Sequence, residues 1–370
     1  MPFQVSTKIV DCPSLGEFFD TYSVGESDLI VTNEYVINPH LGGATLPCDV
    51  IYQEKFGSGE PTEDMVDAMF EQISGKPYKR IIAIGGGTVL DIAKLFVFGD
   101  GKKCEEIFAK GAELPRQRKL LAIPTTCGTG SEVTMISIVN FEKKGTKMGL
   151  AVPALFPDEA VIIPSLLTTQ PYEVFAASSI DAMIHSVESF VSPKATPFSQ
   201  AIARDSIERI IAGYQKIKAT GKQQLPDAQG MNEFLVGSIM GGIAFGNAGV
   251  GAVHALSYPV GSIYHVPHGK ANYMFFGAVF ATYKKLGAKM CGLEKIIAGA
   301  LGCEIEKVWE TLFELIDFIL PRQTLTALGT TKANCKEMAE SVIKNQQRLL
   351  VNNPVELSVE EIEKIYLSCM

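Results

Sequence analysis

Four of the chain's five histidines lie in one stretch that begins at Asp181 and ends at His268. Asp181 and His185 are four residues apart, so a helix places their carboxylate and imidazole on the same face. His254 and His268 follow, separated by a segment that contains residues which end helices. We therefore expect His254 on one helix and His268 at the start of the next, with the four side chains converging on one point.

A carboxylate and three imidazoles form a ligand set that suits Zn²⁺ or Fe²⁺, whereas Mg²⁺ and Ca²⁺ prefer oxygen ligands. A structural zinc site usually contains cysteine, which this set lacks, so a catalytic metal is the favoured interpretation. The competing interpretation of Asp181 and His185 is an acidic residue near a helix start, where its charge is favourable. The scarcity of histidine elsewhere in the chain favours the metal.

A glycine loop, residues 85–88, follows an apolar run at 80–84 and precedes a helix predicted over 89–98. Backbone amides at the start of a helix can hold a phosphate, and Thr88 can cap the helix or donate its hydroxyl. The loop matches neither the GxGxxG fingerprint, whose third glycine would fall on Leu90, nor a Walker loop. A tight turn without a ligand remains the alternative.

A threonine loop, residues 124–132, follows the apolar run at 120–124 and contains three threonines, a serine and two glycines. Ligands of parallel sheets bind at the carboxyl ends of strands, so these donors are expected to face a ligand. A polar loop without a ligand is the alternative. Cys127 lies in this loop, but no base is paired with it in the sequence, and we interpret it as a small, partly buried residue.

The elements that must position these loops and histidines differ between the two halves of the chain. Strands and helices alternate in the first half, which predicts parallel pairing in a doubly wound, Rossmann-like α/β dinucleotide-binding domain over residues 1–168. Helices fill the second half, which predicts an α-helical domain for metal and substrate over residues 169–370, after a hinge at 164–171. The predicted strands are 28–32, 49–52, 80–84 and 120–124; the predicted helices are 63–73, 89–98, 172–192, 198–218, 226–245, 250–264, 270–285, 291–300, 304–319 and 331–349.

The composition restricts the class of protein. A net charge of −8 without clusters of lysine and arginine argues against a nucleic-acid partner. Eight scattered cysteines without a CxxC pair indicate reduced thiols rather than a disulfide framework. The first residues lack the pattern of a secretory signal, and no apolar run is long enough to span a membrane. We expect a cytoplasmic protein without a membrane partner.

Taken together, the motifs resemble those of the iron-containing (group III) alcohol dehydrogenases. The resemblance is carried by Gly-Gly-Gly-Thr-Val-Leu-Asp, Pro-Thr-Thr-Cys-Gly-Thr-Gly-Ser-Glu-Val-Thr, Asp-x3-His and His-x13-His, which occur in this order over nearly the whole chain. It implies a fold like that of dehydroquinate synthase and hydride transfer between NAD and a primary alcohol, which can be a hydroxy acid. It also implies one divalent metal, iron by default with zinc as a frequent substitute, and a homodimer or larger homo-oligomer.

The resemblance also implies roles for individual residues. The metal ligands would be Asp181, His185, His254 and His268. Gly86, Gly87 and Thr88 would hold the pyrophosphate, with help from Asp91. The nicotinamide would be lined by Thr125, Thr126 and Thr129. Lys147 would reach the riboses, and Glu60 would lie near the adenosine.

Two positions depart from the family pattern. Asn33 stands where NAD-preferring members often carry an aspartate that repels a 2′-phosphate, so NAD is expected and NADP stays open. Tyr258 stands where many relatives have a second histidine thought to relay the proton, so the relay would be Tyr258 or the nearby His265. A surface or packed histidine is the alternative for His265. Lys270 is a candidate partner for a substrate carboxylate, with a solvated lysine as the competing interpretation.

Three other functions stay open at this point. The first is the same fold acting on another alcohol, such as butanol, glycerol or lactaldehyde. The second is a carbon–oxygen lyase similar to dehydroquinate synthase, which would regenerate its cofactor in each cycle. The third is a nucleotide-binding regulatory module, which would bind the cofactor without a metal.

Overall fold

The computed structural model describes residues 3–370, which form two compact units. One unit comprises Val5–Pro171 and is α/β; the other comprises Tyr172–Met370 together with residues 3–4 and is helical. The predicted fold class is thereby confirmed. That the units are domains divided at residue 168 stays a prediction.

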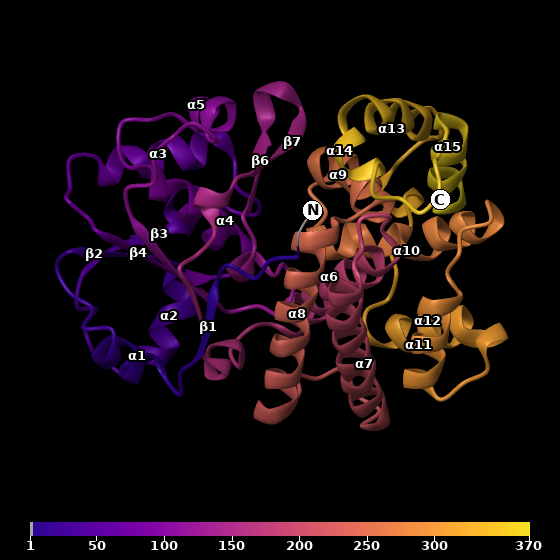
Figure 1. Cartoon of the computed structure of the whole chain (residues 1–370), viewed down its shortest axis with the longest axis horizontal. Coiled ribbons are helices and arrows are strands. Elements are labelled where there is room, and N and C mark those ends of the chain that lie inside the picture. The colour runs from indigo at the N-terminus through magenta and orange to yellow at the C-terminus, as the bar shows by residue number, and fades with distance from the viewer. Residues whose placement is uncertain (1–2) are drawn as a thin grey trace. The chain divides into compact units, whose positions relative to one another are not determined.

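A six-stranded parallel sheet forms the centre of the α/β unit (Figure 1). The four predicted strands are present, and two short strands at one edge, β1 and β8, were not predicted. An antiparallel hairpin of β6 and β7 was also not predicted. The order across the sheet is β1 (Lys8–Asp11), β8 (Glu159–Ile162), β5 (Lys119–Pro124), β4 (Arg80–Gly85), β2 (Asp28–Thr32) and β3 (Asp49–Tyr52); the hairpin strands are β6 (Ile136–Phe141) and β7 (Thr146–Ala151).

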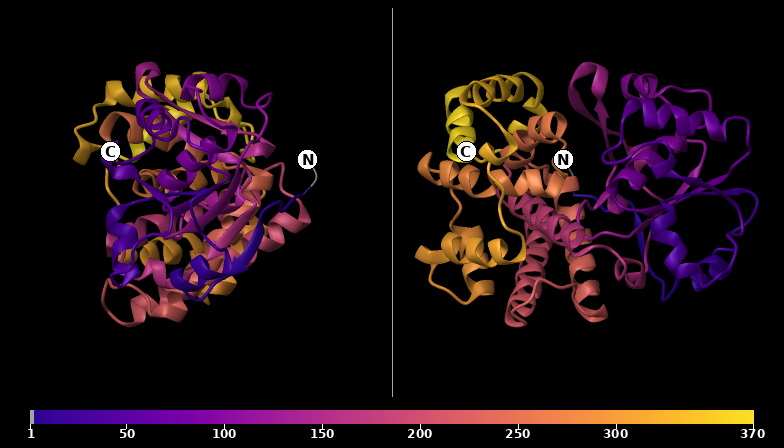
Figure 2. Two further views of the ribbon diagram at one scale, coloured as in Figure 1. Left: turned by 90° about the vertical axis from the view of Figure 1, so that its left-hand side faces the viewer. Right: turned by 180° about the vertical axis from the view of Figure 1, so that it is seen from behind.

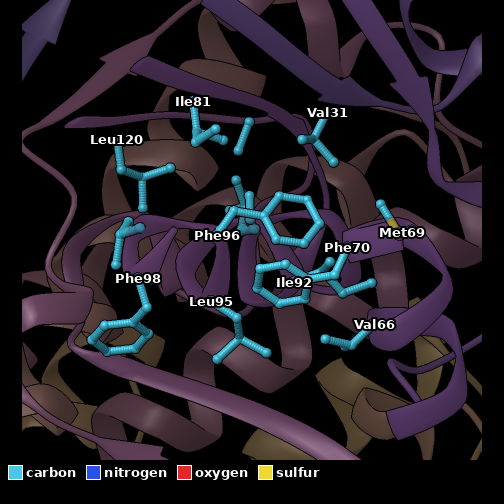
Figure 3. Packing of buried hydrophobic residues seen from close by; sticks show 14 of the residues in the cluster. Val31, Val66, Met69, Phe70, Ile81, Ile92, Leu95, Phe96, Phe98 and Leu120 are labelled. Carbon is cyan, nitrogen blue, oxygen red and sulfur yellow. The ribbon is translucent and has the colours of Figure 1, made fainter. Parts of the chain in front are cut away.

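Helices cover both faces of this sheet, which explains why the inner residues of its central strands are apolar on both faces. On one face, Val31 and Ile81 belong to the same core as residues of α3 (Glu63–Ile73) and α4 (Gly87–Leu95) (Figure 3). On the other face, Ile30 and Ile82 belong to a second core, which includes residues of α1 (Leu15–Thr21) and α2 (Glu34–Leu41). Successive residues of β2 therefore point into different cores, as the two-residue period of a strand requires.

The start of α4 differs from the prediction. The helix begins at Gly87 rather than at Val89, and its N-cap is Gly86, which offers no side chain to the free backbone amides. Thr88 does not cap the helix, because its hydroxyl donates to the Gly59 carbonyl oxygen at 2.9 Å. The amides of the first turn, which have no partner within a helix, are thus left without a side-chain cap.

The helical unit is built around α6, α7 and α8, three long helices that pack against one another (Figures 1 and 2). The predicted helices are all present, with the last two each divided into shorter segments, and α15 was not predicted. Pro259, a residue type that often ends helices, lies inside α9, which agrees with the helix predicted over 250–264. The helices are α6 (Tyr172–Val191), α7 (Pro197–Ala219), α8 (Ala228–Ala248), α9 (Ala252–Tyr264), α10 (His268–Lys285), α11 (Cys291–Leu301), α12 (Val308–Ile319), α13 (Lys332–Asn345), α14 (Gln347–Leu350) and α15 (Val359–Ser368); α5 (Cys104–Lys110) belongs to the α/β unit.

Among residues 3–370, no one helix has the length and apolar composition needed to cross a membrane. By those two measures alone, α8 and α9 meet the test as a pair, bent by 105° at the break between them.

Candidate active site

The four predicted metal ligands come together inside the helical unit. Asp181 and His185 lie on α6, His254 on α9, and His268 is the first residue of α10. Ligand atoms of Asp181, His185 and His254 lie within 4.8 Å of one another. The Asp181 Oδ1 atom is 3.5 Å from His254 Nε2 and 3.8 Å from His268 Nε2. His268 has a side chain that is 29% exposed, whereas the other three residues are buried, so the cluster is open on the His268 side.

The donor set fits a divalent metal ion. His254 Nε2 is buried and has no hydrogen-bond partner of acceptable geometry. Buried polar atoms are rarely left in this state, so a nitrogen of this kind beside a carboxylate and other imidazoles indicates a missing partner. One carboxylate oxygen and three imidazole nitrogens suit Fe²⁺ or Zn²⁺.

The charges of the cluster stabilise one another. Burial alone would raise the pKa of the Asp181 carboxyl, but the neighbouring His185, His268 and His254 hold that pKa well below its usual range. Burial alone would lower the pKa of His254, but Asp181 and Glu188 outweigh it and raise the pKa to about 9. A divalent cation held by these side chains would take the place of the proton that the raised pKa favours on His254.

Two residues that support the cluster were not predicted from the sequence. The Glu188 carboxylate lies 2.5 Å from His254 Nδ1 and accepts the Val253 backbone amide at 2.7 Å. A buried carboxylate on the far nitrogen fixes the orientation of a metal-binding imidazole. Asn272 donates its side-chain amide to Asp181 Oδ1 at 2.7 Å and lies 3.1 Å from His268 Nε2. Glu188 lies seven residues after Asp181 on α6, and Asn272 four after His268 on α10, so helical spacing was the available signal.

A second group of candidate residues lies in the α/β unit, at the carboxyl ends of the central strands. The connection from β2 leads outward to β3, whereas that from β4 leads in the opposite direction to β5. The ends of β2 and β4 therefore border the point where the strand order reverses, which is where such sheets bind ligands. Asn33 follows β2, and the glycine loop follows β4.

The glycine loop and the threonine loop lie in close contact. A Cβ atom on Gly87 would come within 2.7 Å of Thr129 Cγ2, and one on Gly86 within 3.4 Å of Thr126 Cγ2. The Thr125 backbone amide donates to the Gly85 carbonyl oxygen at 3.1 Å. Glycine at position 87 is therefore required for packing, whether or not a ligand binds there.

The remaining cofactor candidates make the following contacts. Asp91 accepts hydrogen bonds from the Ser131 hydroxyl at 2.5 Å and the Ile138 amide at 2.8 Å, so its carboxylate joins α4 to the threonine loop. The buried Lys147 pairs with Glu60 at 2.5 Å.

Asn33 donates to the side-chain oxygens of Gln53 and Glu54, both at 3.0 Å. Glu54 was not predicted as a site residue. It places a carboxylate beside the position where the family pattern led us to expect an aspartate.

Models of one protein family match both halves of the chain. The model of the iron-containing alcohol dehydrogenases matches residues 13–164, and the model of the C-terminal domain of the same family matches residues 175–370. The chain belongs to the iron-containing alcohol dehydrogenase family.

Individual relatives span most of its length. The chain is 41% identical to 4-hydroxybutyrate dehydrogenase of Clostridium kluyveri, over 95% of this chain and 94% of that protein. It is 33% identical to long-chain-alcohol dehydrogenase 1 of Geobacillus thermodenitrificans, over 77% of this chain and 73% of that protein. The structure of the iron-containing alcohol dehydrogenase of Thermococcus thioreducens superposes with a TM-score of 0.83 at 26% identity, covering 100% of this chain and 99% of that one.

Family membership confirms the predicted activity: the protein is an NAD-dependent oxidoreductase that acts on alcohol groups. The lyase and the regulatory module, which the sequence left open, are set aside. The relatives are named for different alcohols, so family membership alone does not identify the substrate, and the residues next to the predicted metal ligands are candidates for that selection.

Three such residues were singled out in the sequence, and the structure separates them. The Tyr258 ring is buried with its centroid 6.0 Å from that of His268. His265 is exposed at the C-cap of α9, with φ of 52°, and among residues 3–370 it has no hydrogen bond, ion pair or ring contact with the four-residue cluster. Lys270 pairs with Glu173 at 2.9 Å, so its charge is already matched by a carboxylate.

Proposed function

We propose that this enzyme interconverts 4-hydroxybutyrate and succinate semialdehyde, using NAD and one divalent metal ion, with Fe²⁺ as the first choice and Zn²⁺ as the alternative. The observation that carries the proposal is the 41% identity to a 4-hydroxybutyrate dehydrogenase over nearly the full length of both chains. The cluster of one carboxylate and three imidazoles supports the metal.

In this proposal, Asp181, His185, His254 and His268 hold the metal, which supplies a Lewis acid for the alcohol oxygen. Glu188 orients the His254 ring, and Asn272 orients Asp181 and His268. Tyr258 is the favoured proton relay, because its ring lies beside the most exposed ligand, whereas His265 is exposed on the surface. The relay removes the hydroxyl proton before hydride leaves the alcohol carbon.

The cofactor lies against the glycine and threonine loops. Uncapped amides of the first turn of α4, around Gly86, Gly87 and Thr88, hold the pyrophosphate. Thr125, Thr126 and Thr129 face the nicotinamide, and the paired Lys147 and Glu60 lie near the ribose and adenosine. Asp91 acts indirectly, because its hydrogen bonds hold the threonine loop in place.

NAD is preferred to NADP in this proposal. The carboxylate of Glu54, hydrogen-bonded to Asn33, provides the negative charge that repels a 2′-phosphate. We further propose a cytoplasmic location and a homodimer or larger homo-oligomer, by analogy with the family.

The test is NADH formation from 4-hydroxybutyrate and from unsubstituted primary alcohols, after reconstitution of the purified protein with Fe²⁺ under anaerobic conditions or with Zn²⁺. We expect turnover with a marked preference for 4-hydroxybutyrate. A preference for unsubstituted alcohols would refute the proposed substrate.

A variant tests the metal ligands. His268→Ala should abolish metal-dependent turnover and leave NAD binding intact, since His268 and the cofactor loops belong to different units. His40→Ala, which removes a histidine outside the cluster, is the matched control. Full activity of His268→Ala after reconstitution would refute the assignment.

A further inference from the structure

Arg348 differs from every other arginine of the chain in its electrostatic environment. The sequence contains seven arginines, and within residues 3–370 Arg348 is the one whose guanidinium pairs with no carboxylate. The other six each have an acidic partner: Arg80, Arg116, Arg118, Arg204, Arg209 and Arg322. Arg348 thus retains an unmatched positive charge in a protein whose net charge is −8.

This charge is separated by one aromatic ring, that of Tyr258, from the most exposed residue of the cluster. Arg348 is on the short helix α14, with its Cζ atom 5.8 Å from the centre of the Tyr258 ring and Nη2 3.4 Å from the Tyr258 hydroxyl oxygen. The Tyr258 ring centre is in turn 6.0 Å from that of His268. The distance from Arg348 Cζ to the centre of the His268 ring is therefore no greater than the sum of these two distances.

Hydrogen bonds from the Asn352 side chain and the ring of Tyr258 hold Arg348 in this position. Asn352 donates its side-chain amide to the Val250 carbonyl oxygen at 2.9 Å and also lies 3.4 Å from the Arg348 carbonyl oxygen. Val250 immediately precedes α9, the helix that carries His254 and Tyr258. Asn352 thereby ties the start of α9 to α14, and the Tyr258 ring beneath the guanidinium adds a cation–π contact that orients it.

We propose that Arg348 binds the carboxylate of the substrate and so determines the preference for a hydroxy acid over an uncharged alcohol. The inference rests on the proposed function. A guanidinium presents two parallel N–H donors that match a carboxylate, which makes arginine well suited to this role. Lys270, the cation first considered from the sequence, is already paired with Glu173. One end of the substrate would then lie at the metal cluster and the other at Arg348, with the Tyr258 ring between them.

The experiment compares 4-hydroxybutyrate with 1,4-butanediol, which has the same number of carbons and the same reacting alcohol but no charge. In Arg348→Ala, kcat/KM for 4-hydroxybutyrate should fall on the order of 10- to 100-fold, mostly through KM, because a hydrogen-bonded charge pair is lost. In the same variant, kcat/KM for the diol should fall far less. Arg348→Lys should fall between Ala and wild type, since it keeps the charge and loses the paired donors.

Two controls separate binding from folding. Arg204→Ala removes an exposed arginine that is paired with Glu208, and it should leave both substrates unaffected. Butyrate, a carboxylate without the alcohol, should inhibit the wild type more strongly than Arg348→Ala. This inhibition reports the carboxylate site independently of turnover.

The outcomes distinguish the two proposals. If the wild type does not prefer 4-hydroxybutyrate to the diol, the proposed substrate is wrong and the role of Arg348 falls with it. The wild type can prefer 4-hydroxybutyrate while Arg348→Ala lowers kcat/KM equally for both substrates or keeps the preference. In that case only the inference about Arg348 is overturned. A fall in kcat/KM for 4-hydroxybutyrate alone, together with weaker inhibition by butyrate, supports both proposals.

Discussion

Replacing Glu188 by Gln tests whether the carboxylate in contact with His254 Nδ1 increases the affinity of the proposed metal site. The substitution keeps the shape of the side chain and removes its charge. Glu188 is 2% exposed and contacts both His254 Nδ1 and the Val253 amide. Water therefore does not readily reach this position to replace the interaction lost with the charge. The glutamine oxygen can still accept one of these hydrogen bonds, so the His254 ring should keep its approximate position while its basicity falls.

The expected size of the effect follows from this geometry. Loss of an outer-shell partner of a metal-binding histidine typically weakens metal affinity by about 10- to 100-fold, which corresponds to about 1.4–2.8 kcal/mol. The contact of 2.5 Å between two buried side chains places Glu188 towards the upper end. The pKa of His254 should also fall from about 9, because a neighbouring negative charge is removed.

Competition between the apoenzyme and a chromophoric chelator for Zn²⁺ measures the affinity directly. Glu173→Gln is the matched control, since it makes the same substitution on the same helix, at an exposed residue outside the cluster. NAD affinity should be unchanged in both variants. A dissociation constant for Zn²⁺ that is the same in Glu188→Gln and wild type would refute the reasoning, because a carboxylate this close to His254 cannot be neutralised without consequence if the imidazole binds the metal.

Two further predictions concern the α/β unit. Burial raises the pKa of Glu132 from 4.5 to about 7, so its ionisation destabilises the folded state as the pH rises through this window. Glu132→Gln removes this cost, and the free energy of unfolding of the variant relative to wild type should increase by up to about 3 kcal/mol between acidic and mildly alkaline pH. Urea unfolding at both pH values measures it, and a difference that does not change with pH would contradict it. Gly87→Ala places a methyl group 2.7 Å from Thr129 Cγ2, which should displace the threonine loop and weaken NAD binding by roughly 10-fold in a fluorescence titration. Gly86→Ala, with its nearest contact at 3.4 Å, should have a smaller effect, and equal effects would argue against the packing explanation.

The sequence predicted the centre of the fold better than its edge. β4 was predicted because its residues are apolar on both faces, which buried parallel strands require. β1 was missed because it lies at the edge of the sheet, where three of its four residues are exposed and the pattern of an interior strand is absent. Only its pairing with β8, which is distant in the sequence, makes it a strand.

The same distinction applies to the candidate site. Asp181, His185, His254 and His268 were found because histidine is rare in this chain and their spacing is informative. Glu188 and Arg348 belong to common residue types. The helical spacing from Asp181 was the one sequence signal for Glu188, and Arg348 had none. Their importance comes from contacts made across helices, to His254 and to Tyr258, which only the folded chain provides.

The four residues proposed as metal ligands come from three helices, α6, α9 and α10, so a bound ion would act as a cross-link within the helical unit. A ligand that binds only the folded state stabilises it by an amount that grows with its concentration, about 2.7 kcal/mol at one hundred times the dissociation constant. The availability of that metal in the cell would then influence the lifetime of the protein as well as its activity. An enzyme that loses its metal would become a preferred target for proteolysis, and the pool of inactive molecules would be cleared rather than stored.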